Sequence, residues 1–296
     1  NMYTQFFGNY LLSNGYITKE QLFTAMKKQL KSHMKLGTLA IHAGYMTASE
    51  VDRIVILQTH EDKKFGELAI EEGYLTQEQV IELLEAQTPD FLLLGQALCD
   101  DGVLNNTDLE NIIADYRSQN ELYELDFSDS MQKNIQNLFD HFLVIAEKPI
   151  NESGKMYMEL LFNNLIRFIG EDFTPLTISE CKEFPTTHCT YQKLTGDAGS
   201  FIAYLDMDEE TAVHFASRYA GEQFSEFDEY VEASMDDFLN LHNGLFAVNM
   251  SNENSQELGL NALEHSIDSV LTFEHTTYEF PVLFPFGTIY MIVQFL

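Results

Sequence analysis

The chain has 296 residues, of which 45% are hydrophobic and 21% charged, a composition that excludes an intrinsically disordered protein and leaves room for two domains. The formal net charge of −31 lies mainly in the second half: residues 1–122 carry 9 basic and 18 acidic side chains, and residues 123–296 carry 7 and 29. This charge disfavours nucleic acid and anionic lipid as partners, because phosphate binding needs clustered Lys and Arg.

The cysteines and the hydropathy pattern favour a reducing compartment, the cytoplasm. Cys99, Cys181 and Cys189 are an odd number without CxxC spacing, which indicates neither a disulfide framework nor a zinc site. No run approaches 18 consecutive apolar residues, and the N-terminus lacks the basic and apolar regions of a signal peptide. We therefore expect a cytoplasmic protein without membrane insertion.

A motif recurs four times in the first half with a spacing of 29 residues. Each copy starts with an apolar residue and a glycine, and a second glycine follows seven residues later. The four glycine pairs are Gly8/Gly15, Gly37/Gly44, Gly66/Gly73 and Gly95/Gly102. Four copies in register indicate an all-helical repeat module.

One copy of the motif predicts two short helices. The second glycine ends the first helix, because glycine adopts the left-handed conformation without steric cost. Thr then starts the second helix and forms a capping box with Gln or Glu three residues later, as in Thr47 and Glu50. Apolar residues at 14 and 18 after the first glycine form one buried face. Such a hairpin is too small to fold alone, so the copies must stack.

The repeat resembles the MshEN domain of secretion and pilus ATPases, whose motif (R/K)LGxxLxxxGxxxxxxLxxxLxxQ binds cyclic di-GMP. Copies two and three match it nearly throughout, whereas copy one has Phe6 in place of the basic residue and copy four has Leu93 there and Tyr116 in place of Gln. The resemblance implies cyclic di-GMP as a ligand. The candidate contacts are Lys35, Leu36, Gly37, Gly44, Gln58, Lys64, Phe65, Gly66, Gly73 and Gln87.

A purely structural interpretation of the same residues stays open. The glycines would cap helices, the apolar positions would fill a core, and the glutamines would be surface groups. A dianionic ligand needs local basic contacts, and Lys35 and Lys64 alone hold the motif position in the two best copies. Which copies would pair into a site is also open: one with two and three with four, or two with three.

The polar and acidic residues 118–130 predict a domain boundary. Helical spacing follows in 131–147, a connecting helix, and again in 156–169, after the sequence INESG interrupts the pattern. We expect a repeat domain at 1–120, a connecting segment at 121–149 and a second domain at 150–296.

The second domain changes from helical to strand periodicity and back. Strands are expected in 174–184, 188–195 and 200–207, with a turn at 196–199 between the last two. A helix should start at Asp208 and end at Gly221, and a longer one should run from about 228 to 248. Two strands in 270–296 are expected to join around Pro285, Phe286 and Gly287. Separate runs of helices and antiparallel strands predict an α+β sandwich.

The longer helix carries a motif similar to that of the CheX family of chemotaxis phosphatases and, more loosely, CheC and FliY. The family has ExxN followed four residues later by a small residue, and this chain has Asp237, Asn240 and Gly244, with Asp in place of Glu. The closing sequence FPFGTIYMIV also resembles the family's last strand. The resemblance covers about 150–296.

The resemblance implies hydrolysis of an aspartyl phosphate on a response-regulator receiver, which supplies its own Mg²⁺, so no intrinsic cofactor is expected. Asn240 would position the attacking water, because an amide donates and accepts without adding charge beside the phosphoryl group. Asp237 would pair with the receiver's Lys, with Glu232 and Asp236 as substitutes, although Asp236 points to a different face. The family also favours a homodimer through the sheet.

Two alternatives complete the functional hypotheses. A non-catalytic adaptor would use the degenerate motif only to dock a partner. The helix face with Asp237 and Asn240 could also be merely solvated, and Asn243 and Asn249 are expected to be capping or surface residues.

Other chemistries find little support in the sequence. The histidines His188, His214, His242, His265 and His275 have no ligand spacing, so we predict no metal site. No P-loop, dinucleotide fingerprint or GxSxG motif is present.

Overall fold

The computed structural model describes residues 2–29, 33–86, 91–121 and 151–296. The chain forms two compact units, Asn1–Asn134 and Ile135–Leu296, which are described separately. The helix expected at 131–147 and the candidate residue Gln87 lie outside the described residues. None of the helices in the described ranges has the length and apolarity needed to cross a membrane.

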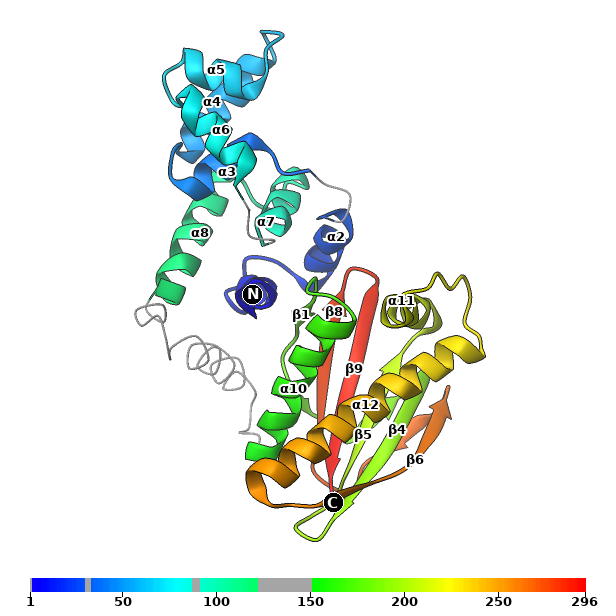
Figure 1. The fold of residues 1–296 in the computed structure, drawn as a ribbon. Helices are drawn as coiled ribbons and strands as arrows, with labels where there is room; N and C mark the ends of the chain where they lie inside the picture. Colours follow the sequence, from blue (N-terminus) through cyan, green and yellow to red (C-terminus); the bar gives the residue numbers. More distant parts are fainter. Residues whose placement is uncertain (1, 30–32, 87–90, 122–150) are drawn as a thin grey trace. The chain divides into compact units, whose positions relative to one another are not determined.

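The first unit is helical, as the sequence predicts. Its described helices, labelled as in Figure 1, are α1 (Met2–Ser13), α2 (Lys19–Gln29), α3 (Leu36–Ala43), α4 (Ala48–Gln58), α5 (Phe65–Glu71), α6 (Gln77–Glu85), α7 (Phe91–Asp100) and α8 (Asn106–Glu121).

The motif residues have the local conformations that their chemistry favours. Gly15, Gly44, Gly73 and Gly102 all have positive φ, between 72° and 77°, so each turns the chain where a side chain would be strained. Thr47 and Thr76 form capping boxes at the starts of α4 and α6. Local sequence therefore sets the ends of these helices.

The first glycine of the motif allows close approach of the helix that follows. A Cβ added to Gly37 would lie 2.9 Å from Val51, and one added to Gly66 would lie 3.5 Å from Val80. A Cβ at Gly95 would lie 2.7 Å from Leu109. In each case the neighbour is the apolar residue 14 positions later, so the motif spacing encodes the packing within one copy.

The second unit combines three described helices with antiparallel strands. The helices are α10 (Glu152–Phe168), α11 (Glu209–Ala220) and α12 (Glu229–Asn254). The strands are β1 (Thr174–Pro175), β2 (Ser179–Glu180), β3 (Glu183–Pro185), β4 (His188–Gly196), β5 (Phe201–Met207), β6 (Leu258–Ile267), β7 (Val270–Thr272), β8 (Thr277–Phe284) and β9 (Gly287–Phe295).

The main sheet has the order β1-β8-β9-β5-β4-β6, with β2 also paired to β8, while β3 and β7 form a separate two-stranded sheet. All of these pairings are antiparallel, which confirms the predicted α+β class. The β4–β6 register shifts between Gln192, which pairs with Leu263, and Leu194, which pairs with Leu260. The edge strand β6 therefore has one extra residue at this bulge.

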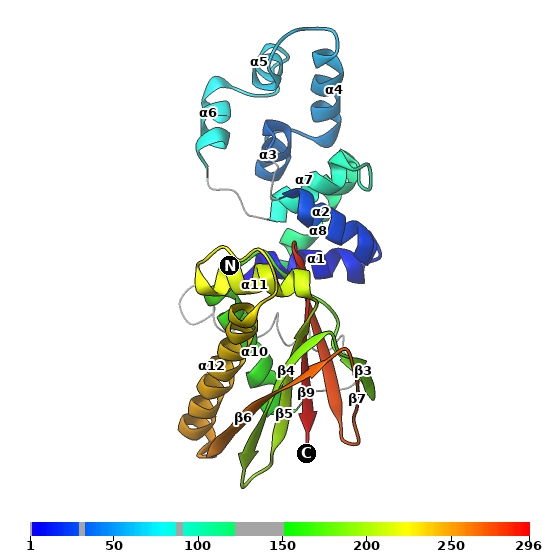
Figure 2. The same cartoon turned by 90° about the vertical axis from the view of Figure 1, so that its right-hand side faces the viewer.

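The helices α10, α11 and α12 cover one face of the main sheet (Figure 2). The core under them is fully buried and includes Leu161, Phe238, Leu239, Phe280 and Met291. A smaller cluster around Phe184, Cys189, Tyr204, Phe273 and Ile292 lies where β3 and β7 meet the strands of the main sheet.

The structure differs from the sequence predictions at several places. Residues 174–184 form parts of three short strands, β1 to β3, rather than one. The strand β6 was not predicted, and α12 runs six residues further, to Asn254. The helix expected from Met156 begins earlier, at Glu152, because the Asn151 side chain accepts a hydrogen bond from the Gly154 amide at 2.7 Å and caps α10.

Candidate functional site

The helix α12 presents Asp237 and Asn240 on its exposed side. The helix begins after Asp228, whose carboxylate accepts hydrogen bonds from the amides of Tyr230 and Val231, both at 3.0 Å. Residues three apart lie on neighbouring positions of a helix surface, so the spacing brings both side chains to one region. The structure thus leaves both predicted catalytic residues accessible.

A buried glutamine on β4 holds the Asn240 side chain. Gln192 is 2% exposed, and its Nε2 donates to Oδ1 of Asn240 at 2.9 Å and to the backbone carbonyl of Asn261 at 2.9 Å. A backbone carbonyl can only accept, so it requires the nitrogen of Gln192 on this side. Asn240 consequently turns its oxygen toward Gln192, and its Nδ2 has no acceptor among the described residues.

The same network continues into the core through Asn243. Its Nδ2 donates to Oε1 of Gln192 at 2.9 Å, and its Oδ1 accepts from the Tyr157 hydroxyl at 2.6 Å. Burial raises the pKa of Tyr157 well above its usual value, which keeps the hydroxyl protonated as a donor. The expectation that Asn243 is a capping or surface residue is wrong: it is wholly buried, because its helix position faces the sheet.

Asp237 lies at the start of the motif and contacts α11. The Tyr219 hydroxyl donates to its Oδ2 at 2.6 Å. Burial and this hydrogen bond to the carboxylate both raise the pKa of Tyr219, so the phenol remains a donor at neutral pH. One carboxylate oxygen of Asp237 is thereby anchored, and Oδ1 has no hydrogen bond among the described contacts.

Gly244 lies one turn after Asn240 on the same side of α12. A Cβ added there would have no heavy atom within 4 Å. Packing therefore does not require glycine at this position, although glycine lowers the stability of a helix interior. Its absent side chain leaves the backbone beside Asn240 open to an approaching partner.

Glu232 and Asp236, the two possible substitutes for Asp237, point elsewhere. Asp236 accepts a hydrogen bond from the Thr190 hydroxyl at 2.6 Å and contacts His265 on β6, which also lies 3.9 Å from Glu232. Asp236 therefore points to a different face from Asp237, as predicted; this face is directed at the sheet edge, and neither residue joins Asp237 at the motif. Sequence reasoning missed Gln192 and His265, whose roles depend on pairings between segments distant in the chain.

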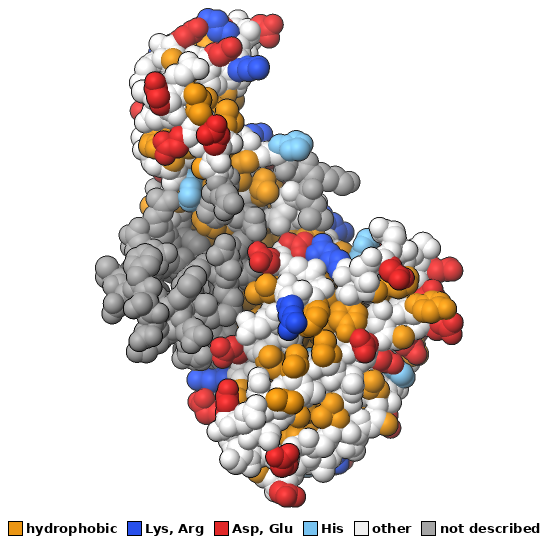
Figure 3. All heavy atoms as spheres, in the orientation of Figure 1, with side chains coloured by type: hydrophobic (Ala, Val, Ile, Leu, Met, Phe, Trp, Pro, Cys, Tyr) orange, Lys and Arg blue, Asp and Glu red, His pale blue; other side chains and the backbone are white. Residues whose placement is uncertain are grey.

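The surface chemistry of the helix-bearing face is mixed. Figure 3 shows hydrophobic side chains between α10 and α12, and acidic side chains toward the side where α11 meets the start of α12. Such a face suits a protein partner with hydrophobic and basic groups better than a polyanion.

In the helical unit, the glycines and apolar residues of the candidate nucleotide site have structural roles. Gly44 and Gly73 have positive φ, and Leu36 and Phe65 pack against the hydrophobic core. A Cβ at Gly37 would lie 3.3 Å from Phe65, and one at Gly66 would lie 3.1 Å from Leu36. Copies two and three therefore pack against each other at their motifs.

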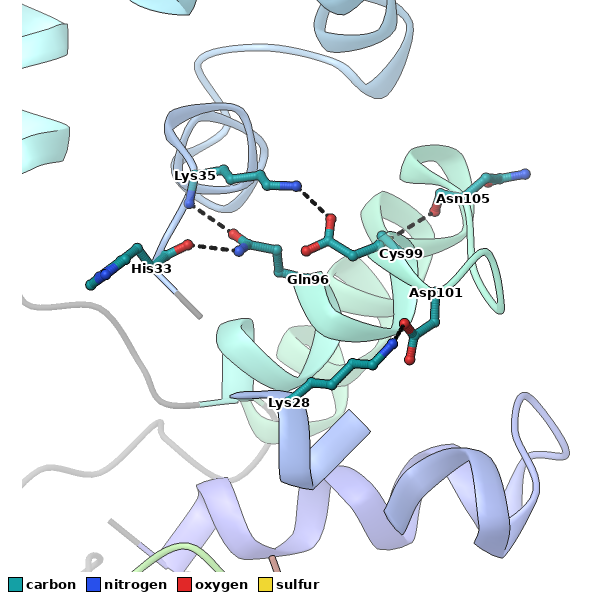
Figure 4. A network of polar contacts seen from close by, with 8 residues as sticks. Lys28, His33, Lys35, Gln96, Cys99, Asp101 and Asn105 are labelled. Carbon is teal, nitrogen blue, oxygen red and sulfur yellow. Dashed lines mark hydrogen bonds and ion pairs between the residues drawn. The ribbon is translucent and has the colours of Figure 1, made fainter. Parts of the chain in front are cut away.

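The basic candidate Lys35 has partners on α7 (Figure 4). Its Nζ lies 2.5 Å from Oδ1 of Asp100, and its backbone amide donates to Oε1 of Gln96 at 2.8 Å. Gln96 in turn donates to the His33 carbonyl at 2.8 Å. Nearby, Lys28 pairs with Asp101. A ligand at Lys35 would have to compete with a carboxylate.

The remaining polar candidates lie on the surface. Lys64 is exposed and precedes α5, and Gln58 is exposed and donates to the Lys63 carbonyl at 3.3 Å. Because Gly37 and Gly66 lie at facing positions, Lys35 and Lys64 flank the starts of two neighbouring helices. The structure brings these two lysines to neighbouring helix starts, and Gln58 at the end of α4 lies beside Lys64, because its side chain contacts the adjacent Lys63 carbonyl.

Comparisons with known proteins concern the second unit. No family model matches the chain, and no curated protein matches it. Several solved structures are similar to this chain, and those described below each cover about half of it. A CheC-like superfamily protein from Shewanella sp. PV-4 has 15% identity over 50% of this chain and 99% of its own, with a TM-score of 0.44.

Two further similar structures are chemotaxis proteins. CheX from Desulfovibrio desulfuricans has 10% identity over 49% of this chain and 100% of its own, with a TM-score of 0.43. CheX from Borrelia burgdorferi, solved with CheY, BeF3 and Mg²⁺, has 18% identity over 49% of this chain and 97% of its own, with a TM-score of 0.38.

Proposed function

We propose that this chain hydrolyses the aspartyl phosphate of a response-regulator receiver, with Asn240 as the residue that positions the attacking water. One observation carries this proposal: the Asn240 amide is accessible while Gln192 holds its oxygen from the interior. A fixed amide on an exposed helix can meet a docked phosphoryl group, whereas a freely rotating one would have to be ordered first. The resemblance of Asp237, Asn240 and Gly244 to the CheX motif supports the same reaction.

The chemistry requires no covalent enzyme intermediate. The water oxygen attacks phosphorus in line, the bond between phosphorus and the aspartyl oxygen breaks, and the carboxylate and inorganic phosphate leave. The free lone pair of Asn240 Oδ1 accepts a hydrogen bond from this water, while Nδ2 donates to a phosphoryl oxygen. The receiver's Mg²⁺ offsets the negative charge, so this chain needs no cofactor of its own for the reaction.

Asp237 and Gly244 serve docking in this proposal. The free oxygen of Asp237 pairs with the receiver's Lys, and the Tyr219 hydroxyl limits the rotation of its carboxylate. Asp is one methylene shorter than the expected Glu, so the receiver must approach α12 more closely. The open space at Gly244 permits that approach.

The test is the rate of phosphate loss from a phosphorylated receiver in Mg²⁺, with and without the protein. Asn240→Ala should reduce the rate to that of the receiver alone, whereas Asn252→Ala, at an exposed position of the same helix, should retain the acceleration. If no host receiver loses phosphate faster, the enzymatic proposal fails. A receiver that binds wild type and Asn240→Ala equally, without faster hydrolysis, would identify an adaptor.

We further propose that the helical unit binds cyclic di-GMP and regulates the second unit. The support is that Lys35 and Lys64 flank the starts of α3 and α5, where helix N-termini also favour a phosphate. Calorimetry should show binding that Lys35→Ala/Lys64→Ala abolishes and that Lys19→Ala, at an exposed position of α2, retains. A flat titration with the intact chain would leave the repeats as a scaffold.

A further inference from the structure

A separate cluster of potential metal ligands lies between α12 and the edge strand β6. Glu232 and Asp236 extend from successive turns of α12, and His265 extends from β6. The ligand atoms of the three side chains all lie within 4.8 Å of one another. Nε2 of His265 is 2.8 Å from Oδ1 of Asp236 and 3.9 Å from Oε1 of Glu232.

The cluster is held by a buried neighbour rather than by solvent. Thr190 on β4 is 1% exposed, and its hydroxyl donates to Oδ1 of Asp236 at 2.6 Å. Hydrogen bonds of this kind orient metal-binding carboxylates and are part of the design of metal sites. The carboxylate therefore has a fixed direction before any ion arrives.

The three side chains line one surface hollow together with a second imidazole, that of His188. Nε2 of His188 lies 3.0 Å from Glu209, but its Nδ1 is buried and has no hydrogen-bond partner in the described structure. A buried polar atom without a partner is uncommon in folded proteins. Two imidazoles and two carboxylates thus line this one hollow.

Charge gives an independent reason for a cation. Two carboxylates at i and i+4 on one helix repel each other. Within the described ranges, neither Glu232 nor Asp236 forms an ion pair with Lys or Arg, and His265 is their only potential cationic partner. A bound divalent ion would neutralise both carboxylates and leave His265 uncharged as a ligand.

We propose that Glu232, Asp236 and His265 bind a divalent transition metal, with Zn²⁺ as the reference ion. One imidazole and two carboxylates form a ligand set typical of such ions, whereas Ca²⁺ and Mg²⁺ prefer oxygen alone. Tetrahedral ligands at about 2.0–2.1 Å from Zn²⁺ are about 3.3 Å apart. The His265 nitrogen lies 2.8 and 3.9 Å from the two carboxylates, and no two of the three ligand atoms are more than 4.8 Å apart, so side-chain movements can reach this geometry. The remaining coordination position is open to water or to a partner's side chain.

The experiment uses the tag-free chain, stripped with a chelator, and Zn²⁺ titrated against a chromophoric competitor. One equivalent should bind, and Asp236→Asn and His265→Gln should each weaken this equivalent at least tenfold. Mg²⁺ at the same concentration should not compete. His275→Gln changes an exposed histidine outside the cluster and should bind Zn²⁺ as wild type does.

Two further readouts separate ligand loss from misfolding. Co²⁺ should give visible absorption in wild type that His265→Gln lacks, and Zn²⁺ should raise the thermal midpoint of wild type and His275→Gln but not of His265→Gln. His265 is exposed, so its replacement should leave the fold intact. Equal Zn²⁺ affinity and stoichiometry in wild type and His265→Gln would overturn the proposal, whatever the result of the phosphatase assay.

Discussion

At the scale of single residues, Gln192 connects the buried centre of the second unit to its surface. Its side chain forms hydrogen bonds with Asn240, Asn243 and the backbone carbonyl of Asn261. One buried side chain thus links the buried Asn243 to the amide at the proposed catalytic position. The CheX-like motif includes no residue of β4. The rigidity on which the proposed mechanism depends therefore comes from outside the motif.

Gln192→Met keeps a similar side-chain volume and removes these hydrogen bonds. We expect kcat for receiver dephosphorylation to fall by as much as about 100-fold, because a misplaced water attacks poorly, with KM for the receiver little changed. The free energy of unfolding should fall by about 1–3 kcal/mol, because the Asn243 amide loses its acceptor. Initial rates and urea unfolding measure the two effects.

Ile289→Val is the matched control for lost stability. Ile289 is fully buried on β9, and this change costs about 0.5–1.5 kcal/mol in typical cores. It should leave kcat unchanged. If Gln192→Met also retains wild-type kcat, Asn240 does not depend on Gln192.

His242 gives a pH prediction. Burial lowers its pKa to about 3, whereas an unfolded histidine titrates near 6.5. Below about pH 6.5 the unfolded chain gains a proton that the folded chain excludes, so stability falls as pH decreases toward 3. Between pH 7 and 5 this contributes a loss of about 2 kcal/mol.

His242→Leu should remove this part of the pH dependence, as measured by urea unfolding at pH 7 and 5. Burial also raises the pKa of Asp206, to about 6, and this group acts in the opposite direction because the folded state retains its proton. The comparison between variant and wild type cancels that contribution. Equal loss of stability in both proteins between pH 7 and 5 would contradict the assignment to His242.

At the scale of elements, α12 shows which features could be predicted from sequence. Spacing of three correctly placed Asp237 and Asn240 near one another, and N-cap residues correctly marked helix starts, because both rules are local. The edge strand β6 was not predicted, because most of its residues are exposed. It therefore lacks the alternation of apolar and polar residues that marks a half-buried strand. Its pairing with β4, and hence the role of Asn261, is a long-range property.

Gly244 allows stability and docking to be separated. Gly244→Ala should raise the free energy of unfolding by about 0.5–1 kcal/mol, because alanine favours a helix and the added methyl meets nothing. Gly244→Gln should fold at least as well as wild type but raise KM for the receiver, because its longer side chain occupies the docking face. An unchanged KM for Gly244→Gln would place the receiver elsewhere.

At the scale of the whole molecule, the chain contains two compact units with separate hydrophobic cores. The change from a 29-residue helical repeat to strand periodicity predicts two domains. The sequence could not indicate which motif copies meet, because their identical spacing fits more than one pairing. The close approach of Gly37 to Phe65 shows that copies two and three are in contact.

Separate cores predict separable unfolding. Scanning calorimetry should resolve two transitions. Gly44→Ala should lower only the first unit's transition, because a non-glycine residue at positive φ costs about 1–2 kcal/mol. His242→Leu, measured at neutral pH, should change only the second unit's transition. Coincident shifts of both transitions in either variant would show that the units unfold together.

The position of β6 at the edge of its sheet links two distant parts of the second unit mechanically. The carbonyl of Asn261 that orients Gln192 belongs to this outermost strand, which pairs with β4 on one side only. Fraying of the strand would release Gln192 and let the Asn240 amide turn over. A metal ion bound by His265 and by the two carboxylates of α12 would hold β6 against such fraying. The orientation of the Asn240 side chain on α12 would therefore depend on how stably the edge strand is held.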